Sequence, residues 1–562
     1  MTLKCAYALA AVVVLVAFSR ILVVDRTRPQ GFDEPAHVSA GMEWLQFHTY
    51  RLDPLHPPLA RLAIAAPLYL AGERFRKLDS ASLPQFWEAG NSIIYQNGRY
   101  LHNLLLARSG MLPFFVILLT VSFVWTRKQF GDLAALAALI LLSSLPLVLS
   151  FSSLAYTDMP AACLQVSFLF AFAAWLDDPK FTSSAALGTL FGLAVLTKFT
   201  SLFYLPIAGG AVLLTRCVLH NKEESGLSLE TKLVRNLAIV VLLMSIVTWG
   251  GYGFSVGHVD EALDLSTSGM PSFQHFPSLV RGIAKRMVAS DWTIPAPSLF
   301  VGVAEVWTMN SSAPDAYLFG KHKPGGWWYF FLLEALLKTP LPFLILLVVG
   351  LRPLYRRALQ RDWKSLVPAI ATVSVLTLTT AAKTNYGLRH VLIIFPLLAI
   401  IAGCGANELW NAGQKWRELG RAFVLCLIAW QCITVLRPGS DWIAYFNGLG
   451  GRDPSRILVT GCDFDCGQDL LNLAEELHRR KVTHVGVAVW SSADVSQMGL
   501  PEFEVLEPFQ PETGWVAVSI RAMREGSVLH KSYPPGAFAW LDQYRPVAQV
   551  GRTIGLYYIP PA

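Results

Sequence analysis

The sequence contains little charge for its length. Of its 562 residues, 15% are Asp, Glu, Lys or Arg, whereas soluble chains average about 25%. Low-complexity and heptad-patterned segments are also lacking, because 12% aromatic residues and 33 prolines are dispersed along the chain. These features exclude a disordered, collagen-like or coiled-coil protein. With 53% hydrophobic residues, the composition indicates a multi-pass membrane protein that carries additional mass outside the membrane.

Nucleotide-binding glycine motifs are also missing. No Walker or dinucleotide glycine pattern occurs in a segment predicted to be cytoplasmic. If the protein is a transferase, its activated donor must therefore be carried by the membrane and be available outside the cytoplasm. The formal net charge of +7 does not indicate a nucleic-acid partner, because membrane proteins carry an excess of Lys and Arg in their cytoplasmic loops.

Cysteine is scarce, and six of the eight residues fall in or beside apolar segments, where a small buried apolar side chain is expected. Cys462 and Cys466 are the exceptions and lie close together in GCDFDCG. An oxidising compartment would permit a disulfide between them. A zinc site is the less favoured alternative, because no second pair of Cys or His residues accompanies them.

Apolar segments long enough to cross roughly 30 Å of hydrocarbon are numerous. About eleven occur, at residues 5–24, 109–126, 132–150, 158–176, 184–200, 201–219, 234–255, 327–351, 366–382, 388–406 and 421–438. The first has no small-residue cleavage site after it and is expected to remain as a membrane span. The fifth and sixth form either a tight pair or one kinked segment, so the number is uncertain by one or two.

Lys and Arg gather in one alternating set of the loops between these segments. The positive-inside rule assigns that set to the cytoplasm. Its cations are Arg127, Lys128, Arg216, Lys222, Lys232, Arg235, Arg352, Arg356, Arg357, Arg361, Lys364, Lys415, Arg417 and Arg421. Two long loops, 25–108 and 256–326, and the tail after residue 438 are then extracytoplasmic. We therefore expect a multi-pass protein of the cell membrane, an inner or plasma membrane.

The chain is predicted to have two parts, a membrane domain over residues 1–438 and a small extracytoplasmic α/β domain over residues 439–562. In the second part, QDLLNLAEELHRR has apolar residues at helical spacing, an acidic start and a basic end. Short strands are predicted at RILVTG, THVGVAVW, EFEVLEP, GWVAVSI and TIGLYYI.

Carboxylates and imidazoles gather in the first outer loop. Asp33 and Glu34 follow the first span and precede a proline, a pattern that by itself is typical of a capped surface helix. His37 lies one turn later, and Asp53 and His56 precede a second predicted helix. Such a cluster at a membrane surface favours binding of a divalent cation or positioning of a catalytic base.

Four further charged residues are predicted at the same membrane face. Asp158 opens the fourth span and is also a plausible helix cap, while Lys198, Lys383 and Arg389 lie near the outer ends of spans. Ionisable side chains at membrane depth indicate function, although Lys and Arg near a span end also extend to the interface. An anionic ligand, such as a lipid phosphate, would explain the cations together.

Several motifs in this order resemble the GT-C membrane glycosyltransferases, in particular the polyprenyl-phosphate-mannose protein mannosyltransferase and aminoarabinose transferase group. The resemblance covers about residues 1–480. It is carried by Asp33, Glu34, His37 and Gly41, by HPPLARL from His56, by TDMP ending at Pro160, by LAVLTKFTSLFYLP, by GWWYFFLLEALLKTPLP from Gly326, by NYGLRHVLIIFPLLAI from Asn385, by AYFNGLGG from Ala444 and by FDCGQDL from Phe464. Cys466 departs from the pattern, since it stands where a tryptophan is expected.

The resemblance implies a GT-C fold and the transfer of a sugar from a polyprenyl-phosphate donor to an acceptor hydroxyl of a protein, lipid or glycan. It makes Asp33 the expected catalytic residue and Asp158 the second acidic position, with Glu34 and His37 helping to position substrates. Lys198, Lys383 and Arg389 are the expected contacts of the donor phosphate. His56 and Asp53, or Glu34, are candidate ligands for a divalent metal.

Two functions from other classes compete with this reading. A secondary transporter would carry similar spans, but paired hydropathy repeats are not evident and the outer loops are large. A non-catalytic lipid-binding assembly factor would share the fold without the chemistry.

Overall fold

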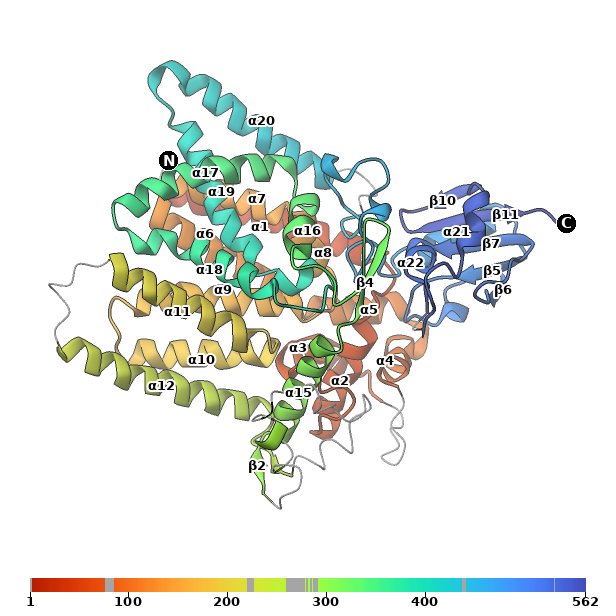
Figure 1. Cartoon of the computed structure of the whole chain (residues 1–562), viewed down its shortest axis with the longest axis horizontal. Coiled ribbons are helices and arrows are strands. Elements are labelled where there is room, and N and C mark those ends of the chain that lie inside the picture. The colour runs from red at the N-terminus through yellow and green to blue at the C-terminus, as the bar shows by residue number, and fades with distance from the viewer. Residues whose placement is uncertain are drawn as a thin grey trace.

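The structure is a computed structural model that describes residues 3–75, 85–219, 227–258, 278, 281–283, 286, 292–436, 441–529 and 531–561. Most of the expected loop 256–326 up to residue 291, and the expected domain boundary at 438, lie outside these ranges. Figure 1 shows a bundle of apolar helices, a middle layer of short helices and a C-terminal sheet.

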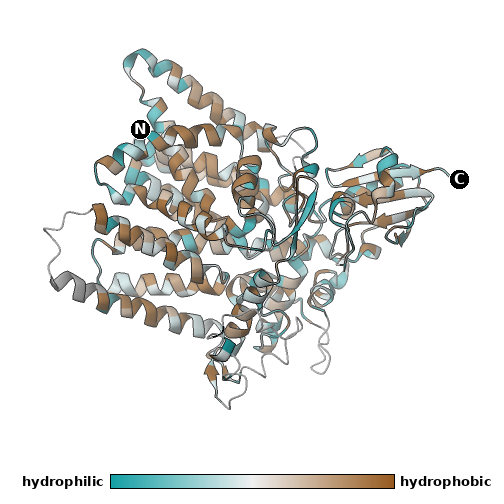
Figure 2. Cartoon of the chain, in the orientation of Figure 1, coloured by the Kyte–Doolittle hydropathy of each residue, from teal (hydrophilic) through white to brown (hydrophobic). Residues whose placement is uncertain are grey.

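The helices of the bundle correspond to the eleven apolar segments. They are α1 (Leu3–Asp25), α6 (Leu112–Phe130), α7 (Asp132–Ser143), α8 (Pro146–Ser152), α9 (Asp158–Trp175), α10 (Phe181–Thr197), α11 (Ser201–Leu219), α12 (Leu227–Gly251), α16 (Phe330–Lys338), α17 (Leu341–Leu359), α18 (Trp363–Thr379), α19 (Ile394–Trp410) and α20 (Arg417–Leu436). A short 3-10 turn, η4 (Leu388–Val391), precedes α19. Figure 2 shows that these helices are predominantly hydrophobic.

Two of the apolar segments are bent helix pairs. Pro146 separates α7 from α8 at an angle of 64°, and Pro340 separates α16 from α17 at 114°. A proline disfavours helical geometry in the residue before it, and Leu145 and Thr339 are both extended.

Fewer helices have the length and composition of a membrane span than the sequence has apolar segments. Among the described residues, six helices are long and apolar enough to cross a membrane, or eight if each bent pair is one span. The other three segments are α10, α18 and α19, at 17 residues each. Such helices measure about 25 Å, slightly less than a typical hydrocarbon core.

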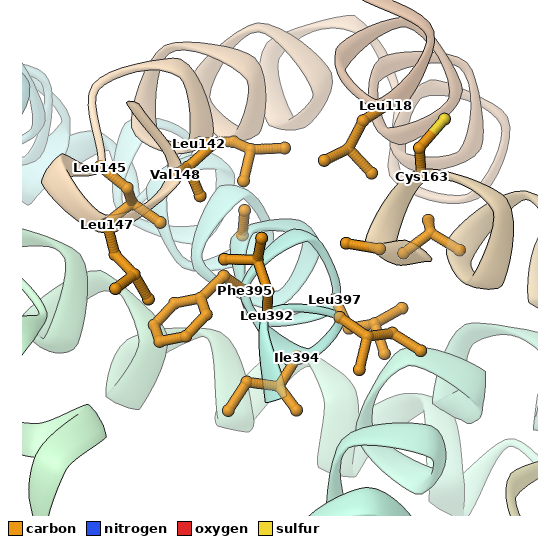
Figure 3. Packing of buried hydrophobic residues seen from close by; sticks show 14 of the residues in the cluster. Leu118, Leu142, Leu145, Leu147, Val148, Cys163, Leu392, Ile394, Phe395 and Leu397 are labelled. Carbon is orange, nitrogen blue, oxygen red and sulfur yellow. The ribbon is translucent and has the colours of Figure 1, made fainter. Parts of the chain in front are cut away.

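The core of the bundle is formed by aliphatic and aromatic side chains from α6 to α9 and from α19. Leu118, Leu142, Val148, Cys163 and Phe395 are buried in this cluster, and Figure 3 shows them among the surrounding helices. Because α19 packs against α7 and α17, the core fixes the position of η4 at the start of α19. Arg389 is part of η4.

The middle layer comes from the two long loops. The first loop forms α2 (Glu34–Phe47), α3 (Pro58–Leu70), α4 (Phe86–Ile94) and α5 (Tyr100–Ser109). The described part of the second forms β1 (Val256–Gly257), β2 (Ile294–Pro295), α15 (Pro297–Ser311), β3 (Asp315–Leu318) and β4 (Lys321–Pro324). Close packing of α2 on α3 depends on Gly41, since a Cβ atom there would lie 2.2 Å from the carbonyl oxygen of Arg61.

The C-terminal part contains the expected α/β domain. Its five-stranded sheet has the order β10-β11-β7-β5-β6, in which β5 is parallel to β6 and β7. The elements are α21 (Leu470–Arg479), β5 (His484–Ala488), β6 (Glu502–Val505), β7 (Gly514–Ser519), α22 (Ile520–Glu525), β8 (Ser527–Val528), β9 (Lys531–Ser532), β10 (Ala548–Val550) and β11 (Ile554–Ile559).

One of the predicted strands is wrong. RILVTG, residues 456–461, forms no strand, because its polar groups bond to the outer loop instead. The amide of Phe319 donates to the Ile457 carbonyl at 2.9 Å, and the amide of Tyr317 donates to the Thr460 hydroxyl at 3.2 Å. This segment therefore connects the C-terminal domain to β3. It also places residues 462–466 against the end of the bundle where α9 begins.

The two ends of the bundle carry different groups. Helix α9 begins at Asp158 and ends beside Asp177, whose carboxylate pairs with Lys364 at 2.7 Å. The end with Asp177 also holds the Arg127–Asp132 and Arg356–Glu408 pairs, at 2.7 and 3.0 Å. The basic loops thus lie at one end, while the first outer loop and the C-terminal domain lie at the other.

Candidate functional site

Asp33 and Arg389 form an ion pair at the non-basic end of the bundle. Arg389 Nη1 lies 2.5 Å from Asp33 Oδ2, although the two residues are 356 positions apart. Asp33 is the residue before α2, and Arg389 is held by η4. Their side chains are 26% and 16% exposed, so a ligand can reach both.

Asp158 and Lys198 form a second, deeper ion pair. Lys198 Nζ donates to Asp158 Oδ1, and the side chains are only 8% and 3% exposed. Asp158 begins α9 and Lys198 follows α10. The two pairs are neighbours, since Arg389 interacts electrostatically with Asp158, and Lys198 with Asp33. Two carboxylates and two cations thus give the cluster no net charge.

His37 and His56 form the wall of the site next to the pairs. Their rings meet edge to face, with centroids 5.2 Å apart. Burial, followed by the nearby Arg61, lowers the pKa of both imidazoles well below the usual value. Both are therefore neutral. His37 Nδ1 accepts from Arg61 Nε at 3.3 Å, which leaves the proton of the neutral ring on Nε2.

Glu34 is fully engaged in holding the first outer loop. Its carboxylate accepts two bonds from Arg108, each 2.8 Å long, and one each from the Gly31 and Ala155 amides at 2.6 and 2.7 Å. Both side chains of the pair are completely buried. Because Glu34 has no free lone pair facing the site, its contribution is to position Asp33, its neighbour in the chain.

The residues expected as metal ligands do not form a cation site. Asp53 Oδ2 pairs with Arg61, and its other oxygen accepts from the Leu55 amide at 3.1 Å. His56 lies close enough to Arg61, Lys198 and Arg389 to interact with their positive charges. Among the described residues, no group of three or more His, Cys, Asp or Glu side chains could hold a metal ion. These side chains therefore do not fit a divalent cation.

Lys383 lies outside the cluster of ion pairs. It is exposed in the segment between α18 and η4, where its amide donates to Asn310 Oδ1 at 2.9 Å. The structure therefore brings together Asp33, Asp158, Lys198, Arg389 and the two histidines, and leaves Lys383 at the rim.

The comparison with protein families identifies a region that includes the deeper ion pair. Residues 107–249 match the sequence profile of the dolichyl-phosphate-mannose-protein mannosyltransferase family. The matched segment contains Asp158 and Lys198, whereas Asp33 and Arg389 lie outside it. The match confirms the resemblance found in the sequence over this part of the chain. No curated protein matches the chain significantly.

Several solved structures are similar to this chain at low identity. ArnT from Cupriavidus metallidurans bound to undecaprenyl phosphate has 14% identity and a TM-score of 0.49, over 99% of this chain and 98% of that one. AglB from Archaeoglobus fulgidus, in complex with an inhibitory peptide and a dolichol-phosphate, has 13% identity and a TM-score of 0.48, over 91% and 69%.

A third similar structure is the S. cerevisiae protein O-mannosyltransferase complex bound to the sugar donor. It has 17% identity and a TM-score of 0.35, over 45% of this chain and 34% of that one. All three TM-scores lie below 0.5.

Three groups near the site escaped prediction from the sequence. Tyr156 accepts the Asp33 amide at 3.0 Å, and Arg61 and Arg108 hold the outer-loop carboxylates. Tyr156 lies in the short loop before Asp158, and Arg61 is the sixth residue of HPPLARL. Arg61 lies in the helix predicted after Pro58, and Arg108 directly precedes the apolar segment 109–126. A single arginine in such a place does not predict its partner.

A cleft of about 510 Å³ lies elsewhere, between α4 and the C-terminal domain. Its lining includes Trp87 and Asn91 from α4, and Val489, Asp494 and Phe503 from the domain. Among the described residues, the lining has no Lys or Arg and includes the carboxylates of Glu88 and Asp494, which do not suit an anionic headgroup. The ion pairs, unlike this cleft, bring two cations and two carboxylates together at one place.

Proposed function

We propose that this protein is an integral membrane glycosyltransferase that transfers a sugar from a polyprenyl phosphate to an acceptor hydroxyl. The observation that carries the proposal is the accessible Asp33–Arg389 pair beside the buried Asp158–Lys198 pair. The match of residues 107–249 to a family named for a dolichyl-phosphate-linked sugar supports the class of donor.

A polyprenyl phosphate leaves easily, so no general acid has to protonate the departing oxygen, unlike in a glycosidase. Asp33 accepts the proton of the acceptor hydroxyl as its oxygen attacks the anomeric carbon. The new carbon–oxygen bond forms as the bond to the phosphate oxygen breaks, and the phosphate takes the electron pair. Attack from the face opposite the phosphate inverts the anomeric carbon.

Arg389 links the two halves of this reaction. In the resting site it neutralises Asp33. When Asp33 takes up the acceptor proton, the Asp33 charge disappears, and Arg389 becomes available to the phosphate as that group gains negative charge. Lys198 is the deeper cation of the site and adds positive potential at the phosphate. Its pairing with Asp158 keeps it in place. Lys383 at the rim is suited to the first contact with the lipid headgroup.

The site is proposed to face the extracytoplasmic side. The basic loops gather at the opposite end of the bundle, which favours a cytoplasmic location for that end. We infer an inner or plasma membrane, with the C-terminal domain outside. The acceptor is a hydroxyl of a protein, lipid or glycan that reaches the outer surface.

Radiolabelled polyprenyl-phosphate sugars test this function directly. The purified protein is incubated with each labelled donor and a membrane extract, and the protein, lipid and glycan fractions are counted separately. We expect one donor to be consumed and one fraction to gain label. Folded protein that consumes none of the donors would contradict the proposal and favour a transporter or a lipid-binding assembly factor.

A further inference from the structure

Tyr156 lies between the accessible ion pair and a disulfide of the C-terminal domain. Its hydroxyl oxygen accepts a hydrogen bond from the Asp33 amide, with 3.0 Å between nitrogen and oxygen. The same oxygen lies 3.2 Å from each sulfur of the Cys462–Cys466 disulfide. The guanidinium carbon of Arg389 is 5.3 Å from the centre of its ring. Tyr156 thus touches both members of the Asp33–Arg389 pair and the disulfide.

The direction of these hydrogen bonds follows from the groups present. The Asp33 amide donates to Tyr156, so the hydroxyl proton of Tyr156 points elsewhere, and disulfide sulfurs can only accept it. Burial raises the pKa of the phenol well above its usual value, which keeps the proton on the oxygen. Free thiols at the same place would offer their own protons and, without the covalent bond, would move apart.

The loop that carries the disulfide is held from both sides. Asp463 accepts the Leu388 amide at 2.9 Å, next to Arg389, and its carbonyl accepts Lys338 Nζ from α16. On the other side, Arg521 of α22 donates to the Gly461 carbonyl at 2.9 Å. The disulfide therefore belongs to a loop that contacts both the bundle and the sheet domain.

The backbone just before Asp33 also packs against this pair of groups. A Cβ atom at Gly31 would lie 3.1 Å from the Tyr156 hydroxyl and 3.3 Å from Cys466 Sγ. The chain at residues 31–33 is consequently in contact with both the tyrosine and the disulfide. A shift of either group would move Asp33 relative to Arg389.

We infer that Tyr156 and the Cys462–Cys466 disulfide are positioning groups for Asp33, and that sugar transfer depends on the disulfide through the Tyr156 hydroxyl. This inference rests on the proposed function of the Asp33 site. Neither group touches the reacting atoms. Together they fix the backbone of Asp33 and the face of Arg389, and a misplacement of about 1 Å at a reacting group costs about a hundredfold in rate.

Three variants test the inference: Tyr156→Phe, the double variant Cys462→Ser with Cys466→Ser, and the triple combination. We expect the first two each to lower kcat by about ten- to a hundredfold, with little change in KM for the lipid donor. Both changes are expected to act on Asp33 through the same contacts. The kcat of the triple variant should therefore be no lower than that of the less active of the first two variants. Cys217→Ser, a matched control that is exposed near the end of α11 at the basic end of the bundle, should keep the full rate.

Melting temperature and binding of the labelled donor identify variants that fail to fold. If the cysteine variant does not fold, Tyr156→Phe still tests the inference, because it removes one oxygen atom and keeps the ring. Mass spectrometry of the active protein without reductant should find both cysteines bonded. If the wild type transfers sugar and Tyr156→Phe has the same kcat, the inference is overturned. Free thiols at both cysteines of the active protein would also overturn it. So would a loss of kcat in the triple variant equal to the product of the two separate losses. Absence of transfer by the wild type would instead refute the proposed function.

Discussion

Asp33 and Glu34 are adjacent in the chain and have opposite environments. Asp33 has a partly exposed carboxylate with one ionic partner. Glu34 has a fully buried carboxylate with four hydrogen bonds. A buried, saturated carboxylate cannot accept a substrate proton, whereas an exposed one can. The sequence predicted both at the membrane surface, and their burial separates the structural role of Glu34 from the catalytic role proposed for Asp33.

Replacing Glu34 by Ala is expected to destabilise the protein strongly. The change leaves the buried guanidinium of Arg108 without its counter-charge, and breaking such a pair costs about 3–5 kcal/mol. The melting temperature of the purified protein in detergent measures this loss. Glu408→Ala serves as the control, since Glu408 pairs with exposed arginines at the basic end and should lower the melting temperature little. Equal losses in the two variants would refute the structural role of Glu34.

The neutral histidines predict a loss of stability in mild acid. Burial lowers the pKa of His37 and His56 in the folded protein, so below about pH 6.5 the unfolded chain binds protons that the folded chain does not. Stability is therefore unaffected at neutral pH and falls as the pH drops from about 6.5. Melting temperatures between pH 7.5 and 5 should show this decline, and His56→Gln should reduce it. The exposed His102→Gln control should leave the decline unchanged.

At the scale of elements, the site depends on how closely α2 packs on α3. Helix α2 follows Asp33 and carries His37, and α3 carries Arg61, which bonds to His37 and Asp53. The helices approach at Gly41, where the absence of a side chain lets the Arg61 carbonyl come near. The spacing of the two helices thus sets the burial of the imidazoles and the position of Arg61, which together lower the pKa of both histidines.

Gly41→Ala is expected to destabilise the protein, although alanine is the better helix former. The added methyl group would lie 2.2 Å from the Arg61 carbonyl oxygen, and such overpacking costs about 1–3 kcal/mol. Gly210→Ala in α11 is the matched control, because nothing lies within 4 Å of a Cβ atom there. Its melting temperature should stay the same or rise. A higher melting temperature of Gly41→Ala than of the wild type would contradict this prediction and show that α3 moves aside freely.

The elements themselves were largely predictable from the sequence. Apolar runs located the bundle helices, and alternating apolar residues located β5, β6, β7 and β11. RILVTG misled because Ile457 and Leu458 pack against the core of the bundle, and Val459 packs with Tyr317 and Phe464, rather than into the sheet. The angle at each bend was not predictable, since proline marks where a helix breaks and tertiary packing decides how the next helix leaves.

At the scale of the whole molecule, charge divides the protein into two ends. The basic loops meet at one end, and the paired charges of the site meet at the other. The sequence predicted this division from loop composition alone, because alternating helices carry successive loops to opposite ends. It did not predict which carboxylate pairs with which cation. Asp33 and Arg389 meet through the packing of α19 and the first outer loop, which no local pattern encodes.

Impermeant thiol reagents test the proposed orientation. Lys531→Cys places a thiol on the exposed β9 of the C-terminal domain, and Gln360→Cys places one at the exposed basic end after α17. In intact cells, or in spheroplasts if an outer barrier is present, we expect labelling at position 531. Labelling at position 360 should appear only after the membrane is opened. The reverse pattern would invert the orientation and place the site in the cytoplasm.

The most direct test of the account is the rate of sugar transfer by Asp33→Asn. Asparagine keeps the size of the side chain and its place beside Arg389 but cannot take the acceptor proton. We predict a loss of kcat of at least a hundredfold, consistent with general-base catalysis, with donor binding and melting temperature close to those of the wild type. Asp132→Asn, at the basic end beside Arg127, should transfer sugar at the wild-type rate. An Asp33→Asn protein with an undiminished rate would contradict the assignment of Asp33 as the base.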